Sequence, residues 1–231
     1  MIATSQNQWP DTKSALFRQN MVNGQLRTNH VRDGAVLAAM EAVRREDFVP
    51  GVLHSLAYSD EDLAIGRDRY MLAPAVLGRM VQAVSLVSGD KVLDIGCLTG
   101  YSPTVLSQLC QRVIGLESDL EFAIEARRHH EDSSKNVRIV QGELAQGYAE
   151  QAPYDVILLE GAIDSVPHEL LDQLGDGGRL VAVIGGEAEV TGTMGLATLF
   201  VKTGDVVTSR VLFDCAVPRL PGFAQKPAFI F

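Results

Sequence analysis

The sequence has few of the features that mark secreted, membrane or metal-binding proteins. Only three of its 231 residues are cysteines, and Cys97, Cys110 and Cys215 are widely spaced, so we expect neither a disulfide framework nor a metal site. No apolar run is long enough to cross a bilayer. The opening residues, MIATSQNQWPDTKSALF, lack the basic start and apolar core of a signal peptide. We therefore expect a cytoplasmic protein that contacts no membrane.

Basic residues are also outnumbered. The chain has 20 Lys and Arg against 29 Asp and Glu, which gives a net charge of −9 and a pI near 5.0. Such a surface repels phosphate backbones, which argues against nucleic acid as a partner. The 46% apolar and 21% charged content is ordinary for a globular protein. The length suits one α/β domain, alone or with a small appendage.

The first 88 residues predict helices rather than a series of strands. Apolar residues recur at helical spacing in residues 15–26, 33–43 and 73–86, with Asp33 as a candidate N-cap and Pro74 near the first turn of the third helix. The intervening residues 48–72 are mixed in character and predict a loop-rich segment. We interpret residues 1–88 as a helical cap.

From Lys91 onward, short apolar runs alternate with helical segments. The runs are KVLDIG, RVIGLE, NVRIVQG, YDVILLE and GRLVAVIG, and the expected helices cover residues 102–109, 119–130, 143–150 and 166–174. Strands that are apolar on both faces are typical of a buried parallel sheet. Residues 196–214 predict a hairpin that turns at Thr203–Gly204–Asp205. The sequence therefore predicts an α/β fold, a doubly wound, mostly parallel sheet with an antiparallel C-terminal hairpin, over residues 89–231.

The loop after the first strand, Asp94-Ile-Gly96-Cys-Leu98-Thr-Gly100, is the main candidate for a ligand site. In a doubly wound sheet, ligands bind beyond the carboxyl ends of the strands where the strand order reverses. The loop does not match the G-x-G-x-x-G pattern of dinucleotide sites, and the carboxylate of Asp94 is a poor host for pyrophosphate. It suits a ligand with cationic groups, such as the ammonium and sulfonium of S-adenosylmethionine.

Two more acidic residues follow the next two strands. Glu117 ends the second strand, where a carboxylate accepts hydrogen bonds from both ribose hydroxyls. Glu143 follows the third strand, within reach of an adenine amino group. An acidic residue at a strand end is more often a solvated surface group. Three in order at successive strand ends indicate a nucleoside site.

Given these residues, the chain resembles the protein-L-isoaspartate O-methyltransferase family of S-adenosylmethionine-dependent enzymes, from Met21 to Gly185. The segments MVNGQLR, VLAAMEAVRREDFVP, AYSDEDLAIG, VLDIGCLTGYS and NVRIVQGELAQGY carry the likeness. It implies methylation of the α-carboxylate of L-isoaspartyl peptides, so that a peptide or protein carboxylate is the expected acceptor. Cofactor contacts are then expected from Asp94, Gly96, Cys97, Leu98, Gly100, Glu117, Ser118, Gly142, Glu143, Leu144 and Glu160.

The resemblance also implies an acceptor side within residues 1–88, at Tyr58, Asp60, Ile65, Gly66, Arg69, Tyr70 and Leu72. Here the chain departs from the family. Arg69, Tyr70, Met71 and Leu72 stand where the family has Gln-Thr-Ile-Ser, so an apolar Leu72 replaces a serine held to matter for activity. Glu160 at the site rim would repel an acceptor carboxylate unless a cation such as Arg69 lies between them.

Leu98 is a further departure, because the family has glycine at this position. Glycine permits positive φ and a close approach of backbone to ligand. The leucine side chain either packs against the following helix or fills space that the cofactor needs, and the sequence leaves both open. Two alternatives to a repair methyltransferase follow: a methyltransferase with another acceptor, or a catalytically silent binding protein.

Overall fold

A computed structural model of the chain describes residues 10–130, 136–185 and 194–223. Its main feature is a seven-stranded sheet in the order β5-β4-β3-β6-β7-β8-β9. The strands are β3 (Lys91–Ile95), β4 (Arg112–Glu117), β5 (Val137–Gln141), β6 (Tyr154–Ile163), β7 (Leu174–Ile184), β8 (Gly195–Thr203) and β9 (Val206–Cys215). The first five are parallel, and β8 and β9 are antiparallel to their neighbours. The predicted doubly wound sheet is confirmed, and its strand order reverses beside β3.

Alternation along the strands divides the core into two hydrophobic clusters. Val92, Val113 and Val156 belong to the cluster that also contains the N-terminal helices, while Leu93 and Ile114 belong to the other. Neighbouring residues of a strand point to opposite faces of a sheet. These strands are therefore buried on both faces of the sheet, as their apolar runs predicted.

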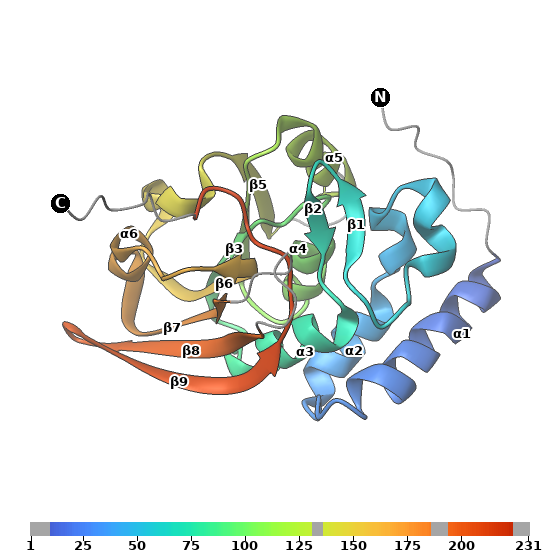
Figure 1. The fold of residues 1–231 in the computed structure, drawn as a ribbon, viewed down its shortest axis with the longest axis horizontal. Helices are drawn as coiled ribbons and strands as arrows, with labels where there is room; N and C mark the ends of the chain where they lie inside the picture. Colours follow the sequence, from blue (N-terminus) through green and yellow to red (C-terminus); the bar gives the residue numbers. More distant parts are fainter. Residues whose placement is uncertain (1–9, 131–135, 186–193, 224–231) are drawn as a thin grey trace.

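The N-terminal helices pack on the first of these faces (Figure 1). They are α1 (Asp11–Met21), continued by a π-helical turn over Val22–Leu26, α2 (Gly34–Ala42) and α3 (Pro74–Ala83). Asp33 caps α2 as predicted, since its carboxylate accepts the N–H of Ala35 at 2.8 Å. Pro74 opens α3, where it has no helical hydrogen bond to lose. One hydrophobic cluster thus joins these helices to the sheet. The division into residues 1–88 and 89–231 includes residues outside the described ranges at both ends of the chain, and its boundary stays a prediction.

The crossover helices are α4 (Tyr101–Leu106), α5 (Leu120–His130) and α6 (His168–Asp172). The expected helix over residues 143–150 is wrong: the chain forms only two short 3-10 turns, Leu144–Gln146 and Ala149–Gln151. Gly147 lies between them with a φ of 64°, outside the helical region. This glycine therefore ends the first turn.

The segment over residues 48–72 is more ordered than the predicted loop. It follows a 3-10 turn at Arg45–Phe48 and contains another at Gly51–Leu56, then a hairpin of β1 (Leu63–Gly66) and β2 (Arg69–Met71). The hairpin is a separate two-stranded sheet. Its strands are too short to give a clear alternation in the sequence, which is why the pattern did not reveal them.

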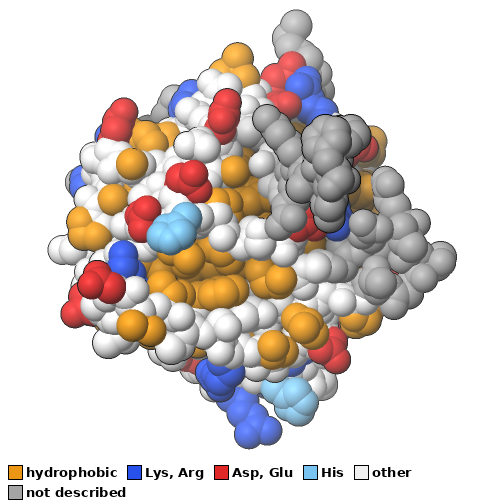
Figure 2. Space-filling view, turned by 60° about the vertical axis from the view of Figure 1, so that its left-hand side comes forward, with side chains coloured by type: hydrophobic (Ala, Val, Ile, Leu, Met, Phe, Trp, Pro, Cys, Tyr) orange, Lys and Arg blue, Asp and Glu red, His pale blue; other side chains and the backbone are white. Residues whose placement is uncertain are grey.

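The C-terminal hairpin is as predicted. β8 and β9 are joined by Gly204 and Asp205, and Gly204 has a φ of 58°, which a tight hairpin turn requires. After β9 the chain runs back past β6 (Figure 1). On the side of α6 and this hairpin, Figure 2 shows hydrophobic side chains gathered in a hollow.

None of the helices formed by residues 10–130, 136–185 and 194–223 has the length and apolar character needed to cross a membrane. Nor do these residues contain a group of three or more His, Cys, Asp and Glu side chains placed to hold a metal ion.

Candidate functional site

Three buried carboxyl groups lie at or near the carboxyl ends of neighbouring parallel strands. Asp94 is on β3, Glu117 on β4 and Glu160 on β6, and all three are at most 5% exposed. In register, Asp94 pairs with Gly115 of β4 and with Leu158 of β6. Asp94 and Glu117, which the sequence placed at strand ends, thus lie with Glu160 at one edge of the sheet, beside the reversal of strand order.

The loop from Gly96 to Gly100 begins with a tight turn. Gly96, Leu98 and Gly100 have φ values of 87°, 49° and 97°. The Gly96 N–H donates to the carbonyl of Leu116 at 2.8 Å, which ties the loop to the end of β4. Cys97, also expected at the cofactor, is buried between the loop and α5. The backbone therefore takes the left-handed conformation that glycine accepts without strain, and Leu98 takes it as well.

The Leu98 side chain lies inside the protein. It is 2% exposed and belongs to the hydrophobic cluster that includes Tyr101 and Val105 of α4. Its N–H donates to Oε2 of Glu117 at 2.9 Å. The side chain is thus buried in the same hydrophobic cluster as residues of the following helix. Apolar burial offsets the roughly 1–2 kcal/mol that the left-handed backbone costs.

Glu117 is surrounded by hydrogen-bond donors. Three backbone N–H groups, those of Leu98, Ser118 and Asp119, and the Ser118 hydroxyl point at its carboxylate. Arg69 adds two more donors: Nη1 to Oε1 at 2.5 Å and Nη2 to Oε2 at 2.9 Å. A carboxylate offers about four lone-pair sites. Glu117 is therefore fully occupied by groups of the protein itself.

Arg69 reaches this carboxylate from β2. It is 5% exposed, and Nη2 also donates to the carbonyl of Gly96 at 3.0 Å. The sequence placed Arg69 on the acceptor side, as a cation between Glu160 and an acceptor carboxylate. The structure places it on Glu117, and its positive charge also lowers the pKa of Glu160 in part. No sequence signal showed the contact with Glu117, because the two residues lie 48 positions apart.

Asp94 and Glu160 form a coupled pair of buried carboxyl groups. The Ser102 hydroxyl donates to Oε1 of Glu160. Burial, with the nearby charge of Glu117, raises the pKa of Asp94 to about 7, and Ser102 and Glu160 lower it in part. Burial and the charge of Asp94 raise the pKa of Glu160 well above its usual range. Two adjacent carboxyls out of water share a proton, so a protonated Glu160 can donate to Asp94. Ser102 is a site residue that sequence reasoning missed.

The chain after β9 also covers these strand ends, which the sequence did not predict. The N–H of Ala162 donates to the carbonyl of Pro218, and the N–H of Leu220 donates to the carbonyl of Ala162, both at 2.9 Å. Leu220 is 4% exposed, and a Cβ added at Gly96 would lie 2.7 Å from its Cδ1. Leu220 therefore fills the space directly over the glycine of the loop.

The remaining predicted cofactor residues follow β4 and β5. Ser118 holds Glu117, and the N–H of Gly142 donates to the carbonyl of Glu117 at 3.0 Å. Glu143 is exposed, whereas Leu144 is buried in the second hydrophobic cluster. Of these residues, the exposed Glu143 is available to a ligand without rearrangement.

The predicted acceptor residues differ in exposure, although Ile65, Gly66, Arg69 and Tyr70 all lie on the β1–β2 hairpin. Leu72 is 1% exposed in the core, where its carbonyl accepts a hydrogen bond from Arg45 at 2.6 Å. Tyr58 is buried and donates its hydroxyl to Glu46. Ile65 is buried as well, Tyr70 is half-buried, and Asp60 and Gly66 are exposed. The serine-to-leucine difference at position 72 is thus a difference in the core.

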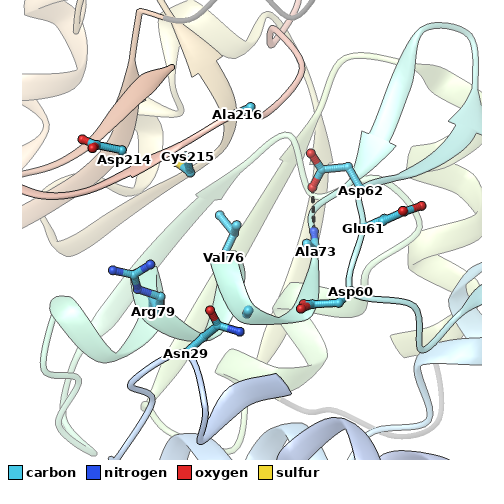
Figure 3. A pocket seen from close by; sticks show the side chains of 11 residues that line it. Asn29, Asp60, Glu61, Asp62, Ala73, Val76, Arg79, Asp214, Cys215 and Ala216 are labelled. Atoms are coloured by element: carbon cyan, nitrogen blue, oxygen red, sulfur yellow. Dashed lines mark hydrogen bonds between the residues drawn. The ribbon is translucent and has the colours of Figure 1, made fainter. Parts of the chain in front are cut away.

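Two cavities lie near these residues. One, of about 420 Å³, has Asp60, Glu61 and Asp62 on one side and Arg79 and Asp214 on the other (Figure 3). The other, of about 360 Å³, lies between the turn of the β1–β2 hairpin and the chain after β9, and is lined by Arg67, Asp68, Arg69, Arg219, Leu220 and Phe223, among others. The second cavity adjoins the Arg69–Glu117 contact.

Comparison with known proteins identifies the family. Residues 13–207 match the model of the family described as protein-L-isoaspartate(D-aspartate) O-methyltransferase. The chain belongs to this family. A protein-L-isoaspartate O-methyltransferase of Koribacter versatilis (strain Ellin345) is 39% identical over 76% of this chain and 80% of its own. One from Methanoculleus marisnigri (strain ATCC 35101 / DSM 1498 / JR1) is 35% identical over 90% of this chain and 94% of its own.

Solved structures show the same fold for this family member. A protein-L-isoaspartate O-methyltransferase structure superposes with a TM-score of 0.77 at 26% identity, and covers 89% of this chain and 66% of the solved chain. A Plasmodium falciparum structure described as a putative enzyme of this kind, in complex with S-adenosyl-L-homocysteine, gives a TM-score of 0.72 at 18% identity. It covers 90% of this chain and 97% of its own, and supports the fold alone.

The residues of this family member suit S-adenosylmethionine in type. Glu117 presents two carboxylate oxygens at the end of β4, the place of a ribose acceptor. The two guanidinium N–H groups of Arg69 now donate to these oxygens, as two ribose hydroxyls would. Both carboxylate oxygens of Glu117 are thus already in contact with Arg69.

Proposed function

We propose that the chain is an S-adenosylmethionine-dependent methyltransferase that methylates a carboxylate of L-isoaspartyl peptides or proteins. Family membership supports the reaction class. The observation that carries the cofactor assignment is the pair of buried carboxyls, Asp94 and Glu117, around a loop whose Gly96 and Gly100 have positive φ. Such a loop lets the backbone approach a ligand closely.

The cofactor supplies the reactive methyl group, and the protein's residues bind and orient the reactants. Glu117 holds the ribose, Gly96 and Gly100 give the backbone its turn, and the exposed Glu143 faces the adenine side. An ionised acceptor carboxylate is already a nucleophile, so no general base is required. The main contribution of the protein to catalysis is then to position the cofactor and the acceptor.

On the acceptor side, exposure divides the candidate residues. Asp60, Gly66 and Tyr70 are at least partly exposed, and we propose them as acceptor contacts. Tyr58 and Ile65 are buried behind them and support their position. Leu72 contributes to the core rather than to acceptor binding.

The direct test combines binding with turnover. Titration calorimetry with S-adenosylhomocysteine measures cofactor affinity, and transfer of labelled methyl to an L-isoaspartyl peptide, beside its normal aspartyl twin, measures the reaction. We expect binding, and transfer to the isoaspartyl peptide alone. Transfer to neither peptide, with intact binding, would leave a methyltransferase with another acceptor.

A second candidate is a binding protein without methyltransferase activity, which the Arg69–Glu117 contact favours. In this case the ion pair is a permanent part of the structure, and the nucleoside never enters. No heat of binding and no thermal shift with about 1 mM S-adenosylhomocysteine, together with no methyl transfer, would decide for this candidate.

A further inference from the structure

The β1–β2 hairpin is held over the strand ends by two arginines. At its turn, Arg67 forms ion pairs with Asp119 at 2.8 Å and with Glu121 at 2.6 Å, at the start of α5. Arg69, two residues on, inserts into the site and contacts Glu117 and Gly96. The hairpin pairs only with itself among the described strands. Its position over the site therefore depends on side chains rather than on the ladder of the main sheet.

Arg69 and a nucleoside cannot hold Glu117 together. The carboxylate already receives six donors, of which the loop after β4 and Leu98 supply four and Arg69 supplies two. When Arg69 leaves, the four other donors keep the buried charge satisfied. Three of them contact Oε1 and only the Leu98 N–H contacts Oε2, so Oε2 is the oxygen that a ribose hydroxyl can reach.

The segment Val217–Phe223 closes the same site from the other side. Its Leu220 lies against Gly96, at the loop where the backbone approaches a ligand. Arg69 and Leu220 line one cavity of about 360 Å³, so the two covering segments meet there. Arg219 pairs with Asp164 at 2.6 Å and holds this segment beside β6.

We propose that Arg69 is an internal competitor of the cofactor. Its guanidinium occupies the ribose acceptor Glu117, Leu220 covers the adjoining loop, and binding requires both to withdraw. This inference rests on the proposed function and adds a means of regulating its site. The apparent affinity for the nucleoside is then reduced by the fraction of molecules in which the site is open.

The test is calorimetry with S-adenosylhomocysteine on the full chain and on Arg69→Gln. The glutamine side chain lacks the charge and the reach of the guanidinium, while the four remaining donors hold Glu117. We expect Arg69→Gln to bind at least about tenfold more tightly than the unmodified chain, since the competing contact is lost. Leu220→Ala is a second test variant, which leaves the ion pair intact. We expect its affinity for S-adenosylhomocysteine to rise about threefold.

Arg112→Gln is the matched control, because it removes the same charge from an exposed side chain at the start of β4, which contacts Gln151 rather than the hairpin or Glu117. We expect its affinity to stay within about twofold of the unmodified chain. Equal gains from Arg112→Gln and Arg69→Gln would overturn the inference, as a general charge effect would explain both. Tight binding by the unmodified chain, unchanged by Arg69→Gln and Leu220→Ala, would overturn it and leave the proposed function standing. Failure of all four proteins to bind at about 1 mM would overturn both.

Discussion

The guanidinium of Arg69 and the carboxylate of Glu117 form a two-point ion pair, with N–O distances of 2.5 and 2.9 Å, and both side chains are almost completely buried. The pair joins a short hairpin of the N-terminal region to the end of a central strand. A change at this ion pair should therefore alter both the free energy of unfolding and the affinity for a ligand at Glu117.

Arg69→Gln should lower the free energy of unfolding. Removing one member of a buried ion pair typically costs about 3–5 kcal/mol, and the four other donors on Glu117 reduce this to roughly 2–3 kcal/mol. Arg67→Gln, whose side chain is half exposed, should cost less than about 1 kcal/mol. Urea unfolding of the two variants measures the difference, and equal losses would contradict the burial argument.

Leu98→Gly should destabilise the protein without changing its affinity for S-adenosylhomocysteine. Glycine relieves roughly 1 kcal/mol of strain at a φ of 49°, but loss of the buried side chain costs about 3 kcal/mol. The net loss is about 2 kcal/mol. Urea unfolding and calorimetry check the two halves of this prediction. A large gain in affinity would mean that the side chain does face the ligand.

The coupled carboxyls predict that stability depends on pH. Burial raises the pKa of Asp94 from 3.8 to about 7, so the folded state binds more protons than the unfolded state between these values. The contribution of this group is complete below about pH 4 and is lost as the pH rises through 7. The free energy of unfolding of the unmodified chain should therefore fall between pH 5 and pH 8. In Asp94→Asn this fall should be smaller, by on the order of 2 kcal/mol.

Urea unfolding at the two pH values measures this slope. Asp60→Asn is the matched control, since it makes the same substitution at an exposed carboxylate of the hairpin region. The same slope in Asp94→Asn as in the unmodified chain would show that Asp94 is ionised throughout, and the interpretation of a shared proton would be wrong.

Leu72→Ser should lower the free energy of unfolding and should not increase methyl transfer. The side chain is 1% exposed in the hydrophobic cluster, so the change creates a cavity and buries a hydroxyl, at about 3–5 kcal/mol. Methyl transfer per folded molecule should stay the same, because the side chain is buried in the hydrophobic cluster and offers no polar contact to an acceptor. A several-fold rise in transfer to the isoaspartyl peptide would show that position 72 does contact the acceptor.

The parts of the fold that depend on local pattern could be predicted from the sequence. Runs apolar on both faces gave the five parallel strands, Gly204 gave the hairpin turn, and Asp33 and Pro74 gave two helix starts. The short β1–β2 hairpin was missed because three or four residues show no clear period. Residues 143–150 were expected to be helical, since their composition outweighed the turn that Gly147 imposes.

The sequence by itself determined that Asp94 and Glu117 lie at the same edge of the sheet, because parallel strands bring their carboxyl ends to one edge. Only the tertiary structure decided what those carboxyls contact. Arg69 and Leu220 reach the site from segments distant in sequence, and no periodicity or turn signal records such a contact. The reason is physical: hydrogen-bond capacity and packing space are settled between side chains after the chain has folded. The sequence thus determined which strand ends meet at this edge of the sheet, and the fold decided that Arg69 contacts Glu117.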